Sequence, residues 1–255
     1  MSDLFSLQGR VALVTGGSRG IGRMMAEGFL RQGATVYISA RKAEACQATA
    51  AELSALGRCV ALPADVSTAA GIAQLVAAFK DHEPRLDILV NNAGAAWGAP
   101  FDEFPEVGWD KVVNLNLKSP FFLTQALHGL LIEGAKGGHP AKVINVASID
   151  GQTVNPLETY SYAASKAGLI HLTKRMALRL IQDQIVCNAV CPGAFASEMN
   201  RAARDEAEQV AARIPARRIG VDEDMAGAAI YLASRAGDYV VGTTLTVDGG
   251  VNLVR

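Results

Sequence analysis

The chain has no long hydrophobic run. Residues 1–9 lack the basic start followed by an apolar stretch that marks a signal peptide. Nowhere does an apolar segment approach the ~20 residues needed to cross a bilayer. We therefore expect a cytoplasmic protein that has no membrane partner.

An excess of charge of either sign is also missing. The 24 Lys and Arg residues nearly balance the 25 Asp and Glu residues, so the formal net charge is -1. No basic stripe runs along any one segment, which argues against nucleic acid as a partner. A small molecule is the expected partner.

Cysteine is scarce. Two of the four cysteines, Cys187 and Cys191, stand in a CxxxC spacing with no second pair of ligands nearby. This pattern does not predict a metal site, and we expect all four to be buried free thiols.

Short β-branched runs alternate with longer amphipathic segments along all 255 residues. This alternation is typical of a parallel sheet with crossover helices, and apolar runs such as 88–90 indicate strands covered on both faces. No linker or repeat divides the chain, so one α/β domain over residues 1–255 is predicted. The expected strands are 11–15, 35–40, 59–62, 87–91, 142–146, 185–191 and 244–247. The expected helices are 22–32, 42–56, 69–82, 160–181 and 222–233.

A glycine-rich turn follows the first expected strand and leads into a helix beginning near Ile21. Glycines in such a turn let the backbone approach a pyrophosphate, which the N–H groups of the helix N-terminus can bind. The spacing is TGxxxGxG and not the general GxGxxG, so a purely structural glycine turn is the alternative. The candidate dinucleotide-binding residues here are Gly16, Ser18, Arg19, Gly20, Ile21 and Gly22.

The end of the second expected strand bears on which dinucleotide binds. An acidic residue normally binds the ribose 2′-hydroxyl of NAD there, but the segment 38–42 has none before Glu44. Arg19 and Arg41 could instead converge on a 2′-phosphate, for which a planar guanidinium is suited. This favours NADP(H), although Arg41 alone is equally typical of a solvated residue at a helix start.

Tyr162 and Lys166 stand four residues apart, downstream of Ser148 at a strand end. Reduction of a ketone needs a hydride, which a nicotinamide supplies, and a proton, for which Tyr162 is the candidate donor. A free phenol has a pKa near 10, and the charge of Lys166 one helical turn away, together with an oxidised nicotinamide ring, is expected to lower it. Ser148 could donate a hydrogen bond to the substrate oxygen or merely cap a turn. Tyr160 is a competing phenol, but it has no lysine four residues later.

Taken together, these features resemble the short-chain dehydrogenase/reductase family across essentially the whole chain. Within that family the sequence is most similar to bacterial NADPH-dependent 3-oxoacyl reductases. The resemblance implies a Rossmann-type doubly wound fold, a three-layer α-β-α sandwich with a mainly seven-stranded parallel sheet. The motifs that carry it, in order, are 15–22, Asp65-Val66, Asn91-Asn92-Ala93-Gly94, Asn116, Ser148, Tyr162 with Lys166, Pro192-Gly193 and 248–250.

The resemblance also implies roles for residues outside the glycine turn. Asp65 and Val66 would hold the adenine, Asn92, Ala93 and Gly94 would lie against its ribose, and Pro192 and Gly193 would flank the nicotinamide. Ser197 replaces the threonine usual in the family. Asn116 would link the active-site lysine to solvent through water, with Asn114 as the alternative. From the residues alone, Asp65 could be a neighbour of a helix cap and Asn91-Asn92 a turn signal.

The substrate is less defined. Trp97, Ile149, Phe195 and Met199 are expected to form an apolar wall, which suits an acyl chain or a ring. Residues 194–215 have the composition of a flexible lid, whose arginines either bind an anionic group or form a solvated helix face. Asp183 weakens the case for an acyl carrier protein, because carrier-binding relatives often have a basic residue there.

Two rival functions remain open. A polyol or sugar-acid dehydrogenase, of the gluconate or glucose type, would have the same catalytic residues. A non-catalytic nucleotide sensor would not need an acidic side chain beside a cation. The resemblance further implies a homotetramer, with the helices of Asn116 and Tyr162 at an interface.

Overall fold

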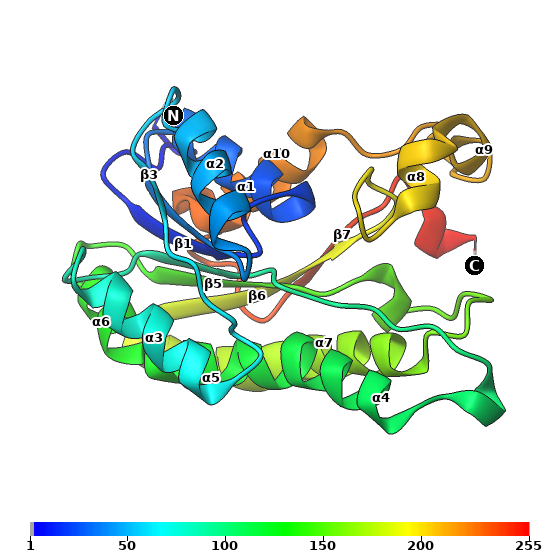
Figure 1. Cartoon of the computed structure of the whole chain (residues 1–255). Coiled ribbons are helices and arrows are strands. Elements are labelled where there is room, and N and C mark those ends of the chain that lie inside the picture. The colour runs from blue at the N-terminus through cyan, green and yellow to red at the C-terminus, as the bar shows by residue number, and fades with distance from the viewer. Residues whose placement is uncertain (1–2, 255) are drawn as a thin grey trace.

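Seven parallel strands form a single central sheet in the computed structural model, which describes residues 3–254 (Figure 1). Their order is β3-β2-β1-β4-β5-β6-β7, so the chain starts at the centre, winds to one edge and then returns to build the other half. This confirms the predicted doubly wound parallel sheet. The strands are β1 Val11–Thr15, β2 Thr35–Ser39, β3 Cys59–Ala61, β4 Ile88–Asn91, β5 Ala141–Val146, β6 Ile185–Pro192 and β7 Thr244–Val247.

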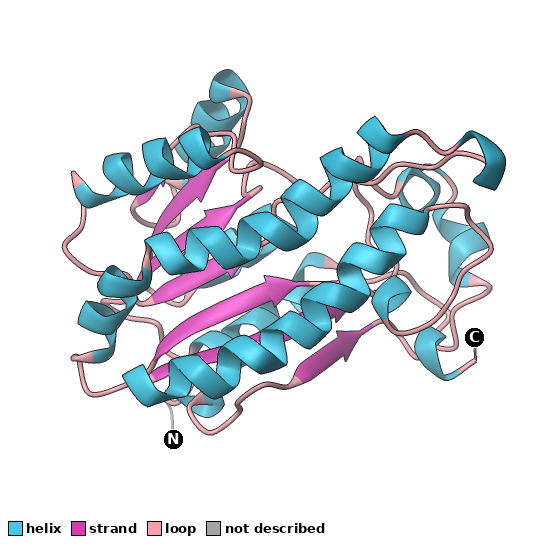
Figure 2. Ribbon diagram, turned by 90° about the horizontal axis from the view of Figure 1, so that it is seen from below, coloured by secondary structure: helices cyan, strands magenta, loops and turns pink. Residues whose placement is uncertain are grey.

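Helices cover both faces of the sheet (Figures 1 and 2). One layer holds α1 Gly20–Arg31, α2 Ala43–Leu53 and α10 Asp222–Ala233. The other holds α3 Ala69–Lys80, α4 Glu106–Val113, α5 Ser119–Ala126, α6 His128–Ala135 and α7 Tyr160–Leu180. Two short helices, α8 Arg201–Asp205 and α9 Ala207–Ala211, lie in the segment after β6.

The core contains three apolar clusters, and the two larger ones lie on opposite faces of the sheet. Side chains of β1 alternate between them: Ala12 and Val14 pack with α1 and α10, whereas Val11 and Leu13 pack toward α3 and α7. This alternation follows from the two-residue period of a strand. All five residues of β1 are buried, as expected for a strand covered on both faces.

The predicted strands agree with the observed ones to within a residue at each end, and the five predicted helices are all present. The helices α4, α5 and α6 were not predicted as separate elements. Between α4 and α5 the chain forms one π-helical turn, Asn114–Lys118. Within residues 3–254, no helix is both long and apolar enough to cross a bilayer.

The carboxyl ends of parallel strands meet at one edge of the sheet. The turns after β1, β4, β5 and β6 carry the glycine-rich segment, Asn92, Ser148 and Gly193 respectively. The topology therefore gathers most of the predicted site residues along this edge, near the point between β1 and β4 where the strand order reverses.

Candidate active site

The glycine turn is fixed by Asn92. Gly16 has φ +65°, and a Cβ atom there would lie 2.7 Å from Asn92 Nδ2. That amide donates to Thr15 O at 2.9 Å and to Gly16 O at 3.2 Å. Gly22 also faces Asn92, so a side chain at Gly16 or Gly22 would displace the amide that holds the turn.

Thr15 joins the same turn to the end of β4. Its hydroxyl accepts hydrogen bonds from the backbone N–H groups of Asn92 and Ala93, both at 3.0 Å, and donates to Val90 O. Asn91 is buried and donates to Asn145 Oδ1 on β5 at 2.9 Å. The Asn-Asn-Ala segment thus ties together the central strands at the edge where the site lies.

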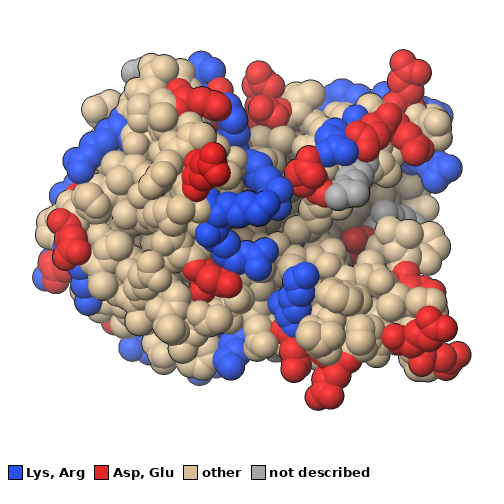
Figure 3. Space-filling view, in the orientation of Figure 1, with Lys and Arg blue, Asp and Glu red and all other residues tan. Residues whose placement is uncertain are grey.

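Arg19 and Arg41 are both exposed at this edge, Arg19 at the start of α1 and Arg41 between β2 and α2. No ion pair in the described part of the chain joins either guanidinium to a carboxylate. Figure 3 shows lysine and arginine side chains gathered beside a hollow on this face of the molecule. The two cations therefore stand free to receive an anionic group.

Asp65 lies just before α3, where Val66 is buried. One carboxylate oxygen, Oδ1, accepts hydrogen bonds from Ser67 N at 3.0 Å and from Ser67 Oγ at 2.6 Å. Thr68, and not Asp65, is the N-cap of α3. Asp65 therefore organises the turn before this helix.

Lys166 is almost fully buried on α7. Its Nζ atom donates to Val146 O at 2.7 Å and lies 5.6 Å from the centre of the Tyr162 ring. Burial penalises the charged form and lowers the pKa of Lys166 to about 8. The ammonium group of Lys166 is thus held beside the phenol, as predicted.

The protein groups around Tyr162 do not by themselves produce the lowered pKa that is expected with an oxidised nicotinamide ring beside it. Burial raises the pKa of this phenol to about 12, opposed by the hydrogen bond with Ser148 and reinforced by the charge of Asp150. The reason for the difference is desolvation, which opposes the phenolate more than the neighbouring groups of the protein favour it. The protein by itself therefore keeps Tyr162 protonated, in the state of a proton donor.

Ser148 caps a turn and contacts Tyr162. Its hydroxyl bonds to Tyr162, and it also accepts a hydrogen bond from Asp150 N at 3.1 Å as the N-cap of the short 3₁₀ turn Ile149–Gly151. Gly151 packs on α7 so closely that a Cβ there would lie 2.6 Å from the carbonyl carbon of Lys166. The turn after β5 is thereby pressed against the helix that carries Tyr162 and Lys166.

Asn116 is buried in the π-helical turn. Its side chain accepts from Ala95 N and donates to Ala95 O, both at 2.9 Å, and also donates to Ser165 Oγ at 3.1 Å. A Cβ added to Gly94 would lie 3.3 Å from Asn116 Oδ1 and 3.8 Å from Lys166 Nζ, so these two side chains are neighbours. π-Helical turns are frequent at functional sites.

The competing phenol, Tyr160, is engaged in contacts with other residues. Its hydroxyl donates to Glu158 Oε1 at 2.8 Å, and its ring packs edge-on against Phe101 and Phe104. Glu158 Oε1 also accepts from Phe101 N at 3.1 Å. Sequence reasoning missed Glu158, which ties the loop before α7 to the segment after β4.

Phe195 and Ile149, expected in an apolar wall at the mouth of the site, are buried in the core instead. Trp97 is half-buried against Gly108, and Met199 is exposed. Phe195 and Ile149 each pack into an apolar cluster next to the sheet, which explains why they do not form the expected wall. The mouth is therefore less apolar than the sequence suggested.

Gly193 and Ser197 follow β6. A Cβ at Gly193 would lie 2.7 Å from Asp248 Cα, and Ser197 lies next to Gly20 of the glycine turn. Ser197 Oγ also accepts from Asn200 N at 3.0 Å. The segment after Pro192 therefore runs from the end of β7 toward the glycine turn.

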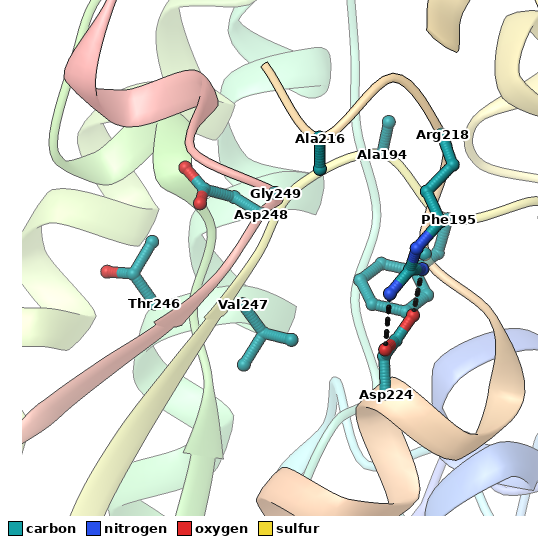
Figure 4. A pocket seen from close by; sticks show the side chains of 10 residues that line it. Ala194, Phe195, Ala216, Arg218, Asp224, Thr246, Val247, Asp248 and Gly249 are labelled. Carbon is teal, nitrogen blue, oxygen red and sulfur yellow. Dashed lines mark hydrogen bonds and ion pairs between the residues drawn. The ribbon is translucent and has the colours of Figure 1, made fainter. Parts of the chain in front are cut away.

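A cavity of about 260 Å³ lies beside this segment (Figure 4). Its walls include Phe195, Thr246 and Asp248, and the ion pair of Arg218 with Asp224 closes one side. Neither Tyr162 nor Ser148 lines it. The cavity is thus distinct from the Tyr162 site.

Of the arginines expected in the lid, Arg204 and Arg213 lie at the surface, and the side chain of Arg201 lies outside the part of the chain that the structure describes. Arg204 forms ion pairs with Glu198 and Asp205, and Arg213 is exposed. This arrangement favours the solvated helix face over an anion site. The four cysteines are free and buried, as predicted.

Comparison with known proteins agrees with this arrangement. A family model described as enoyl-(acyl carrier protein) reductase matches residues 16–252. The rhamnolipids biosynthesis 3-oxoacyl-[acyl-carrier-protein] reductase of Pseudomonas aeruginosa is 46% identical over 99% of this chain and 100% of its own.

Two solved structures extend the similarity. The Pseudomonas aeruginosa RhlG/NADP active-site complex has a TM-score of 0.95 and 47% identity, covering 99% of this chain and 100% of that one. A gluconate 5-dehydrogenase from Burkholderia cenocepacia in complex with NADP and tartrate has a TM-score of 0.90 and 35% identity, covering 98% of both chains. The glycine turn, the Ser148, Tyr162 and Lys166 cluster and these matches over the full length lead to one conclusion: the chain belongs to the short-chain dehydrogenase/reductase family of oxidoreductases.

Proposed function

We propose that this protein reduces a ketone to a secondary alcohol with NADPH, and that Tyr162 donates the proton. The observation that carries the proposal is the convergence of three groups at the end of β5. The Ser148 hydroxyl bonds to the Tyr162 phenol, and the Lys166 ammonium lies over the phenol ring. A binding protein would not need an acid and a cation in this arrangement, which argues against the sensor alternative.

The residues at the carboxyl ends of the strands are suited to bind NADP(H). The closeness of Gly16 and Gly22 to Asn92 keeps the turn free of side chains, and the N-terminus of α1 offers N–H groups to a pyrophosphate. The exposed Arg19 and Arg41 suit a 2′-phosphate, and two similar structures are NADP complexes. The other residues that we assign to cofactor binding are Ser18, Gly20, Ile21, Asp65, Val66, Ala93, Gly94, Tyr162, Lys166, Pro192, Gly193 and Ser197. When bound, NADPH supplies the hydride.

Side chains of the protein stabilise and protonate the carbonyl oxygen of the substrate. Ser148 donates a hydrogen bond to it, which stabilises the negative charge as the hydride reaches the carbon. Tyr162 then transfers its phenolic proton to that oxygen, which completes the alcohol. The Lys166 ammonium stabilises the phenolate left behind, and Asn116 holds the backbone beside Lys166. In the reverse direction the phenolate accepts the alcohol proton.

The substrate that we favour is a 3-oxoacyl thioester or another hydrophobic ketone. The similarity to the 3-oxoacyl reductase at 46% identity supports this choice. The second candidate is a sugar-acid dehydrogenase, favoured by the similarity to the gluconate 5-dehydrogenase. The two functions share the catalytic residues and differ in the substrate and in the preferred direction.

We further propose that the chain works in the cytoplasm as a homotetramer with a flexible lid over residues 194–215. The assembly is supported by an apolar groove of about 330 Å³ between α5 and α7, lined by Phe121, Leu172, Met176 and Leu180. Phe121 in this groove is 37% exposed. Two such faces would bury each other in a symmetric contact.

The test is NADPH oxidation by the purified protein with a 3-oxoacyl coenzyme A ester, a bulky aryl ketone and 5-ketogluconate, each repeated with NADH. We expect fast turnover of the thioester with NADPH. Turnover of 5-ketogluconate alone would replace the substrate assignment, and a preference for NADH would overturn the cofactor assignment. Failure of all three substrates with both cofactors would contradict the proposed function.

A further inference from the structure

We propose that the hydrogen bond between Asn145 on β5 and Thr173 on α7 positions the groups that carry out the reaction. It fixes α7 against β5, so that the phenol on the helix meets the hydroxyl at the end of the strand. The inference rests on the proposed reductase function and adds two positioning residues to it. Ser148 follows β5, whereas Tyr162 and Lys166 lie on α7, so the geometry of the site depends on how these two elements are joined.

Asn145 is a fully buried amide in the middle of the sheet. Burying an amide costs free energy unless its polar groups are hydrogen-bonded. Its Oδ1 atom accepts from Asn91 Nδ2 on β4 at 2.9 Å. Its Nδ2 atom donates to Thr173 Oγ1 at 2.9 Å and to Cys187 Sγ on β6 at 3.8 Å. One side chain thus connects three neighbouring strands to α7.

Thr173 fixes the direction of this hydrogen bond. Its hydroxyl has a single proton, which it donates to Leu169 O at 2.7 Å. The Thr173 oxygen therefore accepts from Asn145, which turns the amide nitrogen toward α7 and the amide oxygen toward Asn91. Thr173 is fully buried, and its β-branched side chain is stiff about χ1. The contact therefore holds α7 at a defined position on the strand.

Lys166 makes another contact between the same two elements, but that contact is less restrictive. Its Nζ atom donates to Val146 O at 2.7 Å, next to Asn145 on the strand. Lysine reaches its partner through a flexible four-carbon stem, so this bond can persist while the helix slides or rotates slightly. Thr173 lies about two helical turns further along α7, and its short side chain allows no such movement. The Asn145–Thr173 contact therefore determines where α7 lies.

A matched contact exists on a different helix. Thr124 on α5 accepts from Asn91 Nδ2 at 3.2 Å and donates to Pro120 O at 2.7 Å, which is the arrangement seen at Thr173. Both threonines are buried. However, α5 carries neither the phenol nor the lysine of the site. The two positions therefore have the same chemistry, and only Thr173 joins the helix of Tyr162 to the strand that leads to the catalytic serine.

The experiment compares Thr173→Val with Thr124→Val, each of which replaces a buried hydroxyl by a methyl group of similar size. The kcat and KM for a 3-oxoacyl coenzyme A ester are measured with NADPH, together with the Kd for NADPH. We expect Thr173→Val to lower kcat by about tenfold to a hundredfold, since a displacement of about 1 Å is enough for such a loss, with KM and Kd within about threefold of the wild type. Thr124→Val should keep kcat within about threefold of the wild type.

Two results would overturn the inference: a kcat of Thr173→Val close to that of the wild type, or an equal loss of kcat in both valine variants. Thr173→Ser keeps the hydroxyl and should restore kcat. If it were as slow as Thr173→Val, lost packing and not the hydrogen bond would be the cause, and the inference would fail.

Asn145→Ser breaks the same bond from the strand and decides the inference if Thr173→Val does not fold. It should lower kcat as Thr173→Val does, with the Kd for NADPH retained. A kcat like that of the wild type in Asn145→Ser would contradict the inference.

A further measurement does not need turnover. Amide hydrogen exchange, followed by mass spectrometry, should be faster over α7 in Thr173→Val than in Thr124→Val, because α7 has lost its bond to β5. Equal exchange over α7 in the two variants would overturn the inference. If neither the wild type nor any variant reduced a ketone, the proposed function would fail, while the exchange rates would still decide whether Asn145 and Thr173 hold α7 in place.

Discussion

At the residue scale, burial acts on the two central side chains in opposite directions. It raises the pKa of Tyr162 to about 12 and lowers the pKa of Lys166 to about 8. Both shifts favour the neutral form, because a buried charge loses its hydration. Near neutral pH Tyr162 therefore keeps its proton. Lys166 is still charged there, but its pKa of about 8 lies only slightly above neutral pH.

The small difference between neutral pH and the pKa of Lys166 predicts the pH dependence of ketone reduction. The kcat/KM for ketone reduction should be constant below about pH 8 and fall above it, since Lys166 loses its proton there while Tyr162 keeps its own. Initial rates at saturating NADPH from pH 6 to 10 measure the profile. A kcat/KM that stays level up to pH 10 would contradict the assignment of Lys166 as the charged neighbour of the phenol.

The same shift has a consequence for stability. The pKa of Lys166 in the folded protein lies below its ordinary value, so the buried charge opposes folding below about pH 8, and this penalty disappears as the pH rises toward 10.5. Lys166→Met should therefore raise the free energy of unfolding at pH 7 by about 2 kcal/mol while ketone reduction is lost.

Urea unfolding of both proteins at pH 7 and pH 10 tests this sign. The advantage of Lys166→Met should shrink at the higher pH. A variant that is less stable than the wild type at pH 7 would show that the hydrogen bond to Val146 O outweighs the cost of burying the charge.

Some properties of single residues could not be predicted from the sequence. Tyr162 and Lys166 were identified from their spacing, but the direction of the Tyr162 pKa shift depends on burial, which the motif does not specify. Glu158 was missed because its partners, Tyr160 and the N–H of Phe101, are brought together only by the folded loop.

At the scale of elements, the strands were the most predictable part. Apolar β-branched runs bounded by turn residues specify their positions to within a residue. The π-helical turn Asn114–Lys118 was not predictable, because periodicity does not reveal one inserted residue in a helix. It brings Asn116 to face Ala95 and Ser165, contacts that the sequence did not indicate.

The glycine turn gives the prediction at this scale. Gly16→Ala should weaken NADPH binding at least tenfold, because Gly16 has φ +65° and a new Cβ would displace the Asn92 amide. Fluorescence titration with NADPH measures the Kd. Gly227→Ala in α10 is the control, since its Cβ would meet nothing within 4 Å. Equal Kd values for Gly16→Ala and the wild type would contradict the placement of the cofactor on this turn.

At the scale of the whole molecule, the alternation of strands and helices was sufficient to predict the doubly wound sheet, because each βα unit has to cover one face of it. The folded chain leaves apolar surface uncovered on α5 and α7, where Phe121, Phe122 and Leu178 are exposed.

This surface predicts the behaviour of the assembly. Phe121→Ser should convert the proposed tetramer into smaller species at micromolar concentration, because it removes an aromatic side chain from the groove between α5 and α7. Sedimentation velocity measures the change. Phe5→Ser, also at an exposed phenylalanine but in the N-terminal turn, is the control. A wild type that sediments as a monomer would contradict the proposed assembly.

The central claim is that Tyr162 donates the proton to the carbonyl oxygen during NADPH-dependent reduction. Its most direct test is kcat/KM for a 3-oxoacyl coenzyme A ester with Tyr162→Phe, together with the Kd for NADPH. General acid catalysis typically contributes 10²–10⁴-fold, so we predict a loss of about a thousandfold in kcat/KM with the Kd unchanged within about threefold. If Tyr162→Phe reduced the ester at a rate within tenfold of the wild type, another group would be the proton donor and the account would be wrong.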